Sequence, residues 1–186
     1  MNLLSAQRSA FMQLMDQLWV VGGAAYAMAL GGAIGFEREL KNRPAGFRTH
    51  MLVAGASSLL IGMGQLAIMD PRFRMPFMIT MDPMRLVEAV IGGVSFIGAG
   101  TIFASRGGRN VAGITTAASL LMVAVIGACT GLRYHLLAVA AAVLTLLVLT
   151  VLNWSERRFG MRGVTQAQGD GEGDASRGQA RGRRGE

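Results

Sequence analysis

The sequence is poor in the residues that build catalytic and metal sites. Among 186 residues there is one cysteine, Cys129, and there are two histidines, His50 and His135. A lone cysteine offers neither an internal disulfide nor a metal–thiolate cluster. We find no Ser/His/Asp arrangement and no spacing of metal ligands, so we expect no catalytic residue, no metal and no cofactor. A non-enzymatic protein is favoured; an enzyme acting on lipid stays open, although no nucleophile can be named.

Charge is also scarce, at 16% of residues against about 25% in a typical soluble domain. Hydrophobic residues make up 52% of the chain. The charges leave five apolar runs of 19–22 residues, which are 18–36, 51–69, 86–104, 111–132 and 136–154. A helix of about 20 residues crosses the hydrocarbon core of a bilayer. All four prolines fall between the runs, where they interrupt no helix. The sequence predicts an all-α, polytopic membrane bundle of about five transmembrane helices.

The two ends of the chain differ from this apolar region. Residues 1–17 have no apolar stretch of signal-peptide length, and their scattered Leu, Met and Phe residues suggest an interfacial helix on the membrane surface. Residues 18–154 form the expected transmembrane domain. Residues 155–186 are rich in glycine and arginine, which predicts a disordered basic tail. Attraction of this tail to anionic lipid is a simpler interpretation than contact with nucleic acid, which we do not expect.

The distribution of basic residues predicts the topology. If the gaps between the runs are numbered along the chain, one side of the membrane carries five Lys and Arg residues and the other carries 13. Lys and Arg near the ends of spans accumulate on the cytoplasmic side. We therefore expect the N-terminus outside and the C-terminus in the cytoplasm, with the net charge of +7 arising from this bias.

Both signs of charge gather in residues 35–51, here called the charge island. Its charged residues are Glu37, Arg38, Glu39, Lys41, Arg43 and Arg48. If the first span continues as a helix, Glu37 reaches Lys41 and Glu39 reaches Arg43, each as an i,i+4 pair with the acid first. Pro44 should end this helix at Arg43, because the residue before a proline avoids the helical conformation. The acids would then stiffen the end of the first span.

The third span begins with a capping signal and contains an unusual carboxylate. Asp82 is well placed as the N-cap, with Pro83 at the first helical position. Glu88 is the one charged residue well inside an apolar run, where a carboxylate is costly unless it is paired or faces water. We favour a pair with Arg85 at the interface. The alternative is a proton- or cation-responsive carboxylate in a cavity.

Small residues recur on the first and third spans. Such stripes let a second helix approach closely, and they indicate packing with little specificity. The positions selected for packing are Gly31, Gly35, Gly93, Gly98 and Gly100. Because the third span has almost no side-chain bulk on one side, we expect it at the centre of the bundle.

A basic turn at residues 106–110 precedes Thr115 and Thr116, which open the fourth span. Free N–H groups at a helix start, flanked by arginines, can hold an anion. We favour a plain cytoplasmic turn whose threonine hydroxyls bond to their own helix. No Gly-Lys-Ser/Thr sequence follows, so the pattern is not a P-loop.

Three stretches, 31–53, 82–100 and 113–120, together resemble the MgtC/SapB family of bacterial inner-membrane proteins. Their order and spacing match, and the resemblance covers roughly residues 18–152. It implies a multi-helix domain in the inner membrane, with links to magnesium limitation, acid resistance and intracellular survival in some members. Some members are reported to restrain the ATP synthase, which only this resemblance nominates as a partner. Others carry a folded cytoplasmic C-terminal domain, and we expect this chain to be the short form without it.

The resemblance carries over a set of polar positions. They are Glu37, Arg38, Glu39, Arg48, Thr49, Asp82, Arg85, Thr115 and Thr116. Glu88 is a tenth candidate, because it lies well inside an apolar run. Of these, Arg38 and Arg48 have no obvious local partner. The first functional hypothesis is a regulatory or stress-adaptation protein that acts through a membrane partner, with self-association also open. The alternative is a small ion or proton transporter or channel, suggested by Glu88 and Asp82.

Overall fold

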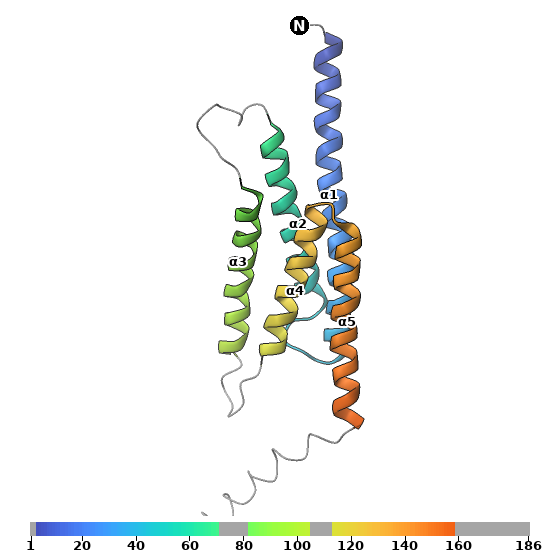
Figure 1. Cartoon of the computed structure of the whole chain (residues 1–186), viewed down its shortest axis with the longest axis vertical. Helices are drawn as coiled ribbons and strands as arrows, with labels where there is room; N and C mark the ends of the chain where they lie inside the picture. The colour runs from blue at the N-terminus through green and yellow to red at the C-terminus, as the bar shows by residue number, and fades with distance from the viewer. Residues whose placement is uncertain (1–2, 71–81, 105–112, 159–186) are drawn as a thin grey trace, which may run out of the picture. The chain divides into compact units, whose positions relative to one another are not determined.

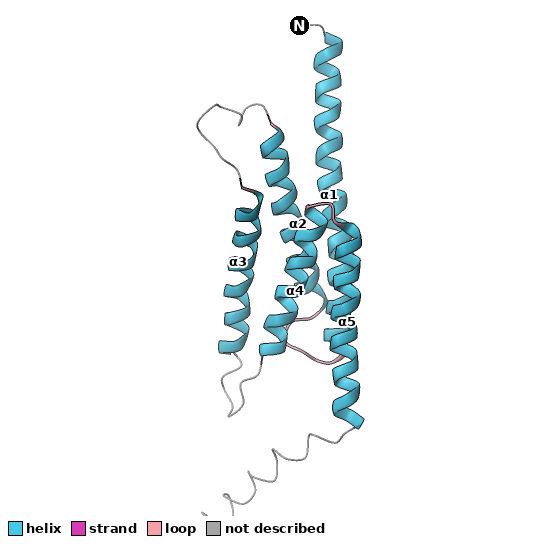
Figure 2. Ribbon diagram, viewed as in Figure 1, coloured by secondary structure: helices cyan, strands magenta, loops and turns pink. Residues whose placement is uncertain are grey.

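The computed structural model describes residues 3–70, 82–104 and 113–158. They form five helices, traced in Figure 1: α1 (Leu3–Leu40), α2 (Phe47–Met69), α3 (Pro83–Ala104), α4 (Ile114–Gly131) and α5 (His135–Arg158). Within those ranges every residue is in a helix, a turn or a loop (Figure 2). The predicted all-α class is confirmed. The basic turn at 106–110 and most of the predicted tail lie outside the described residues.

Four helices are long and apolar enough to cross a membrane. The spans are Phe11–Leu40, Phe47–Met69, Met84–Phe103 and Ile114–Gly131. In α5 the stretch His135–Val151 is also apolar, although it is shorter. A spanning backbone must satisfy its own hydrogen bonds, and helices do so internally. The predicted polytopic membrane bundle is therefore confirmed, while the orientation of its termini stays a prediction.

The first helix is longer than its apolar run requires. Helix α1 continues without a break from Leu3 to Leu40, so residues 3–17 belong to the same helix as the first span. A helix of 38 residues is about 57 Å long, well beyond the roughly 30 Å hydrocarbon core. Part of α1 must therefore extend past the core, and the placement of residues 1–17 on the membrane surface stays a prediction.

Helices α1 to α4 belong to one compact unit, residues 1–146, in which α2 and α4 hold the central positions. Helix α2 contacts α1, α3 and α4, and α4 contacts α1, α2 and α3. The second unit, residues 147–186, begins within α5. Because α1 and α3 are not in contact, they pack on different parts of the α2–α4 pair.

Helices α1 and α4 both come close to α2 at Ala54, which has no exposed surface. A Cβ atom added to Gly31 of α1 would lie 2.7 Å from the Ala54 Cβ. One added to Gly127 of α4 would collide with the Ala54 carbonyl oxygen and lie 2.8 Å from the Ser57 Cβ. The two glycines let α1 and α4 pack against α2 nearly backbone to backbone, as small residues do in membrane bundles.

The predicted packing glycines fall into two groups. Gly31, Gly35 and Gly98 lie at close helix contacts: added Cβ atoms would lie 2.9 Å from the His50 Cβ at Gly35 and 3.2 Å from the Ala117 Cβ at Gly98. Gly93 and Gly100 have open space in the Cβ direction, with nothing within 4 Å.

The expectation that the third span is central is wrong. Helix α3 contacts α2 and α4 but not α1. The reason lies in the glycines of α1 and α4, which occupy the close-packing positions on α2. Apart from Gly98, which packs against α4, the small residues of α3 from Gly92 to Gly100 are exposed.

Gly127→Ala tests this packing. The new methyl group must displace the α2 backbone at Ala54, and overpacking of this kind typically costs about 1–3 kcal/mol. Thermal unfolding in mild detergent should show a clear loss of stability. Gly92→Ala is the matched control, since the added methyl meets nothing within 4 Å and alanine favours helix. Equal melting temperatures for the two variants would contradict this packing.

Candidate functional site

The charge island forms a helix end and a tight turn. Helix α1 ends at Leu40, three residues before the predicted end at Arg43. Asn42 takes a left-handed backbone conformation, with φ of 50°, which terminates the helix before Pro44 can. The predicted ion pair between Glu37 and Lys41 is present and confirmed.

Glu39 has a different partner from the predicted one. Its carboxylate accepts a hydrogen bond of 2.8 Å from the backbone N–H of Phe47, the first residue of α2. The predicted Glu39–Arg43 pair is wrong, because Arg43 lies beyond the end of α1. A carboxylate at a helix start satisfies a free N–H group and complements the helix dipole. Glu39 therefore couples the end of α1 to the start of α2.

Arg38 is the largest fully buried side chain described, with 1% of its surface exposed. One of its terminal guanidinium nitrogens donates a hydrogen bond of 3.1 Å to the Thr116 hydroxyl of α4. Its Nε atom is buried and has no hydrogen-bond partner among the described residues. Thr116 is itself 2% exposed. The arginine that lacked a local partner in the sequence thus makes one hydrogen bond, to a residue 78 positions away, while its Nε stays without a partner.

His50 makes a second buried contact beside it. Its Nδ1 lies 2.9 Å from the Gly46 carbonyl oxygen, and its Nε2 lies 3.1 Å from the Ser119 hydroxyl. A carbonyl only accepts, so Nδ1 carries a hydrogen. The Ser119 hydroxyl is also 2.8 Å from the Thr116 carbonyl, and its single proton can serve only one of the two acceptors. The direction of the Ser119 bond and the protonation of Nε2 therefore depend on each other.

We call Arg38, His50, Thr116 and Ser119 the polar node. It connects α1, α2 and α4 in a region otherwise packed with apolar and small residues. In a medium of low polarity such hydrogen bonds are strong, and a lost partner is costly. The node fixes how the three helices align, and it places the buried guanidinium of Arg38 at their contact.

The remaining predicted residues near the node do not join it. Arg48 and Thr115 are exposed, and Thr49 is partly exposed. Thr116 does not follow the favoured interpretation of threonines bonded only within their own helix, because its hydroxyl accepts from Arg38. The anion-binding alternative depends on arginines outside the described residues and stays untested.

The start of α3 matches its predicted cap but not its predicted pair. The Asp82 carboxylate accepts a hydrogen bond of 2.9 Å from the backbone N–H of Met84, which confirms the N-cap. Within the described segment 82–104, no ion pair links Arg85 to Glu88 or to Asp82, and Arg85 and Glu88 are exposed. The favoured pairing is wrong. An exposed pair gains little against the entropy of holding two long side chains.

Two members of the node, His50 and Ser119, were missed in the sequence. A signal was available, because a histidine at the edge of an apolar run must find partners or face water if the spanning helix begins before it. His50 lies four positions after Gly46 and Ser119 lies three positions after Thr116, so each of these two hydrogen bonds falls within one helical turn. The contact between His50 and Ser119 spans 69 positions and has no sequence signal. Among the described residues, no three His, Cys, Asp or Glu side chains gather as metal ligands.

Thr116→Val tests the node. Valine keeps the shape of threonine but leaves the buried guanidinium without this acceptor, a loss of about 1.5–3 kcal/mol for a hydrogen bond to a charged group. Unfolding in mixed micelles should show reduced stability. Thr115→Val is the matched control, since Thr115 is exposed on the adjacent position of α4. A Thr115 variant as unstable as the Thr116 variant would rule out a special role for the Arg38 bond.

Comparisons with known proteins agree with this architecture. The sequence model of the MgtC family matches residues 25–158. Protein SapB of Bacillus subtilis strain 168 is 35% identical over 136 residues, which are 72% of this chain and 56% of SapB. YhiD of Escherichia coli K12, whose name proposes magnesium transport, is 37% identical over 127 residues, 66% of this chain and 55% of YhiD.

Protein MgtC of Brucella abortus strain 2308 is 36% identical over 129 residues, 68% of this chain and 47% of that protein. The chain therefore spans about half the length of these curated relatives. No solved structure matches it. The family match covers α2, α3, α4 and α5 whole and the second half of α1, including the polar node. The chain belongs to the MgtC family.

Proposed function

We propose that this chain is a non-enzymatic regulatory protein of the bacterial inner membrane that acts by binding a transmembrane helix of a partner protein. The observation that carries the proposal is an open face on α3. Adaptation to magnesium limitation or acid stress is the setting that the family resemblance suggests.

The open α3 face consists of Glu88, Gly92, Phe96 and Gly100. These residues are four positions apart, so they lie along one side of the helix. All four are exposed, and Phe96 has 83% of its surface exposed. Cβ atoms added at Gly92 and Gly100 would meet nothing within 4 Å. The face therefore exposes backbone at two glycines, with one large aromatic side chain between them.

Such a face suits another helix better than lipid. Lipid tails are as apolar as leucine, so helices associate in membranes through close packing and hydrogen bonds. No described residue packs against Gly92 or Gly100 in the direction of a Cβ atom. A helix of a second protein could therefore pack closely at these two glycines. Phe96, between the two glycines, would insert beside the approaching helix and set its position along α3.

Glu88 adds a polar requirement at one end of the face. It lies one turn before Gly92 and has no ion-pair partner in the described part of the chain. A carboxylate at a membrane-facing position calls for a donor or a positive charge. A partner helix with a basic or hydrogen-bonding residue at this depth would supply it, and this requirement would distinguish the right partner from other membrane helices.

The transport alternative draws no specific support from the described residues. Asp82, one of the two carboxylates that suggested it, is occupied in capping α3. Glu88 lies on the exposed side of α3 and away from the α1–α2–α4 contact. In that contact the guanidinium of Arg38 is buried, and the neighbouring Glu37, which has one buried carboxylate oxygen, is paired with Lys41. We therefore carry only the partner-binding function forward.

Site-specific photo-crosslinking in native membranes tests this function. A photoreactive residue at Ala99, which neighbours Gly100, should give one reproducible adduct with a different membrane protein, identified by mass spectrometry. ATP synthase is the candidate named by the resemblance. Gly100→Leu covers the backbone of this face and should reduce the adduct at least about fivefold, equivalent to ~1 kcal/mol. Glu88→Gln should weaken it in the same direction.

The controls use another exposed alanine. A photoreactive residue at Ala33 of α1, and the bulky variant Ala33→Leu, should neither give nor reduce this adduct. Adducts only with a second copy of this chain would replace the partner with a homo-oligomer. An adduct unaffected by both Gly100→Leu and Glu88→Gln would remove α3 from the interface.

A further inference from the structure

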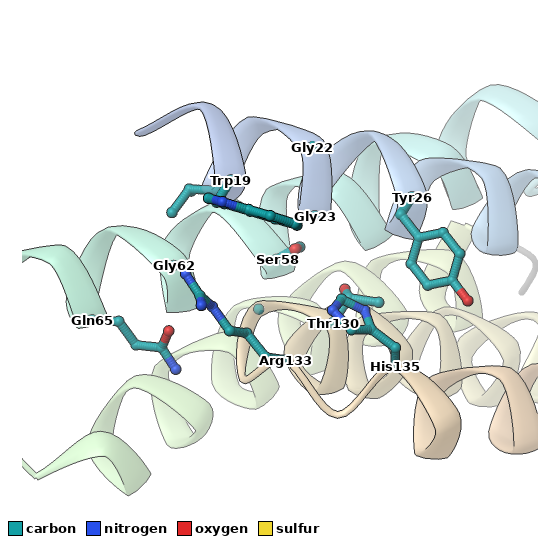
Figure 3. A pocket seen from close by; sticks show the side chains of 12 residues that line it. Trp19, Gly22, Gly23, Tyr26, Ser58, Gly62, Gln65, Thr130, Arg133 and His135 are labelled. Carbon is teal, nitrogen blue, oxygen red and sulfur yellow. The ribbon is translucent and has the colours of Figure 1, made fainter. Parts of the chain in front are cut away.

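A cavity lies at the opposite end of the α1–α2–α4 contact from the charge island. Its volume is about 740 Å³, in the range of small-molecule sites. Figure 3 shows its walls: Trp19 and Tyr26 from α1, Ser58 and Gln65 from α2, and Arg133 from the turn after α4. Glycines on α1, α2 and α4 widen it. All of these residues belong to the unit of residues 1–146.

The backbone at Arg133 is unusual. Arg133 donates its N–H to the Thr130 carbonyl at 2.9 Å, and Tyr134 donates to the Cys129 carbonyl at 2.8 Å. This is the Schellman ending of a helix, whose left-handed position normally holds glycine. Arg133 has φ of 65° there, a conformation that costs free energy for a residue with a side chain. Such an outlier calls for a function of its side chain.

The Arg133 side chain reaches the mouth of the cavity. Its guanidinium lies 5.9 Å from the centre of the Trp19 ring, which is a cation–π contact. In Figure 3 it extends between Trp19 and Gln65. Tryptophan and the turn between two apolar helices both mark the boundary between the hydrocarbon core and the headgroups. We therefore infer that Arg133 lies at the level of the lipid phosphates, beside the cavity that it lines.

Ser58 provides a polar group deeper in the cavity. The side chain is 1% exposed, and its hydroxyl has no hydrogen-bond partner among the described residues. The neighbouring Ser57 bonds to its own helix through the Val53 carbonyl at 2.8 Å, whereas Ser58 lines the cavity. A buried hydroxyl without a partner costs free energy, and a ligand with an acceptor at that point would recover it.

A second hollow of about 340 Å³ lies on the other side of Arg133. It shares Val20, Gly62, Gln65 and Arg133 with the first and adds Asp16 from α1. A positive and a negative side chain thus border adjoining spaces at the headgroup level, with no ion pair between them in the described residues. This arrangement complements a headgroup that carries both a phosphate and a cation.

We propose that the cavity binds one phospholipid with a primary ammonium headgroup. Arg133 binds the phosphate through its planar donor fork. Asp16 accepts from the ammonium, and Ser58 donates to an ester carbonyl of the glycerol. An acyl chain fills the apolar space between α1 and α2. The lipid would stabilise the end of the bundle that lies farthest from the polar node, and this role is independent of the open α3 face.

The test uses the full chain with Trp154→Phe, so that Trp19 is the one tryptophan left. The protein is reconstituted in phosphatidylcholine bilayers that contain increasing fractions of phosphatidylethanolamine with brominated acyl chains. We expect brominated phosphatidylethanolamine to quench Trp19 at about a fivefold lower fraction than brominated phosphatidylcholine or phosphatidylglycerol. Arg133→Gly should abolish this selectivity. In phosphatidylcholine alone, where the proposed lipid is absent, the melting temperature of this variant should stay equal or rise, because glycine relieves the backbone.

Three further arms decide the headgroup chemistry. Asp16→Asn removes the proposed acceptor for the ammonium, so it should reduce the preference for phosphatidylethanolamine over both phosphatidylglycerol and phosphatidylcholine. Arg85→Gln, an exposed arginine outside the cavity, should change nothing. Equal quenching by all three lipids, an unchanged preference in Arg133→Gly, or competition by millimolar inorganic phosphate would each overturn the proposal. A lower melting temperature of Arg133→Gly in phosphatidylcholine alone would instead assign Arg133 a structural role.

Discussion

The near contact of backbones at Ala54 is the constraint on which the rest of the bundle depends. Gly31 and Gly127 bring α1 and α4 against α2 without intervening side chains. At this short separation Arg38 of α1 can reach Thr116 of α4, and His50 of α2 can reach Ser119. The polar node is thus a consequence of the glycine contacts. The hydrogen bonds of the polar node would break if the helices moved apart by the width of a methyl group.

The node in turn explains how an apolar bundle acquires a single arrangement. Apolar surfaces of similar helices can slide past one another at little cost, because lipid replaces protein contacts without a hydrophobic penalty. A buried guanidinium that must meet one hydroxyl permits far fewer alignments. Buried polar groups are known to fix register in this manner in some helical assemblies. Here the residues concerned come from three helices, and Glu39 further couples the end of α1 to the start of α2.

Local features could be predicted from the sequence, and long-range ones could not. The five helices, the Asp82 cap and the Glu37–Lys41 pair each depend on residues within one turn or one apolar run, so their pattern is visible in the chain. The Arg38–Thr116 bond joins positions 78 residues apart, and no periodicity encodes it. Helix α3 shows the same limit. Its glycines predict close packing, but a pattern cannot tell whether the packing partner lies in the same chain.

The positions that break local rules are therefore the informative ones. Arg133 stands where a helix ending favours glycine, and Glu88 leaves a carboxylate exposed on an apolar helix. Ser58 buries a hydroxyl that its own helix could have satisfied, as Ser57 shows. None of these three features stabilises the folded bundle by itself. Sequences that fold well are consistent at every level, and departures from this consistency concentrate at functional sites. One departure lies on the open face of α3 and the other two border one cavity between α1, α2 and α4, so the proposed helix partner and the proposed lipid would bind at separate sites of the bundle.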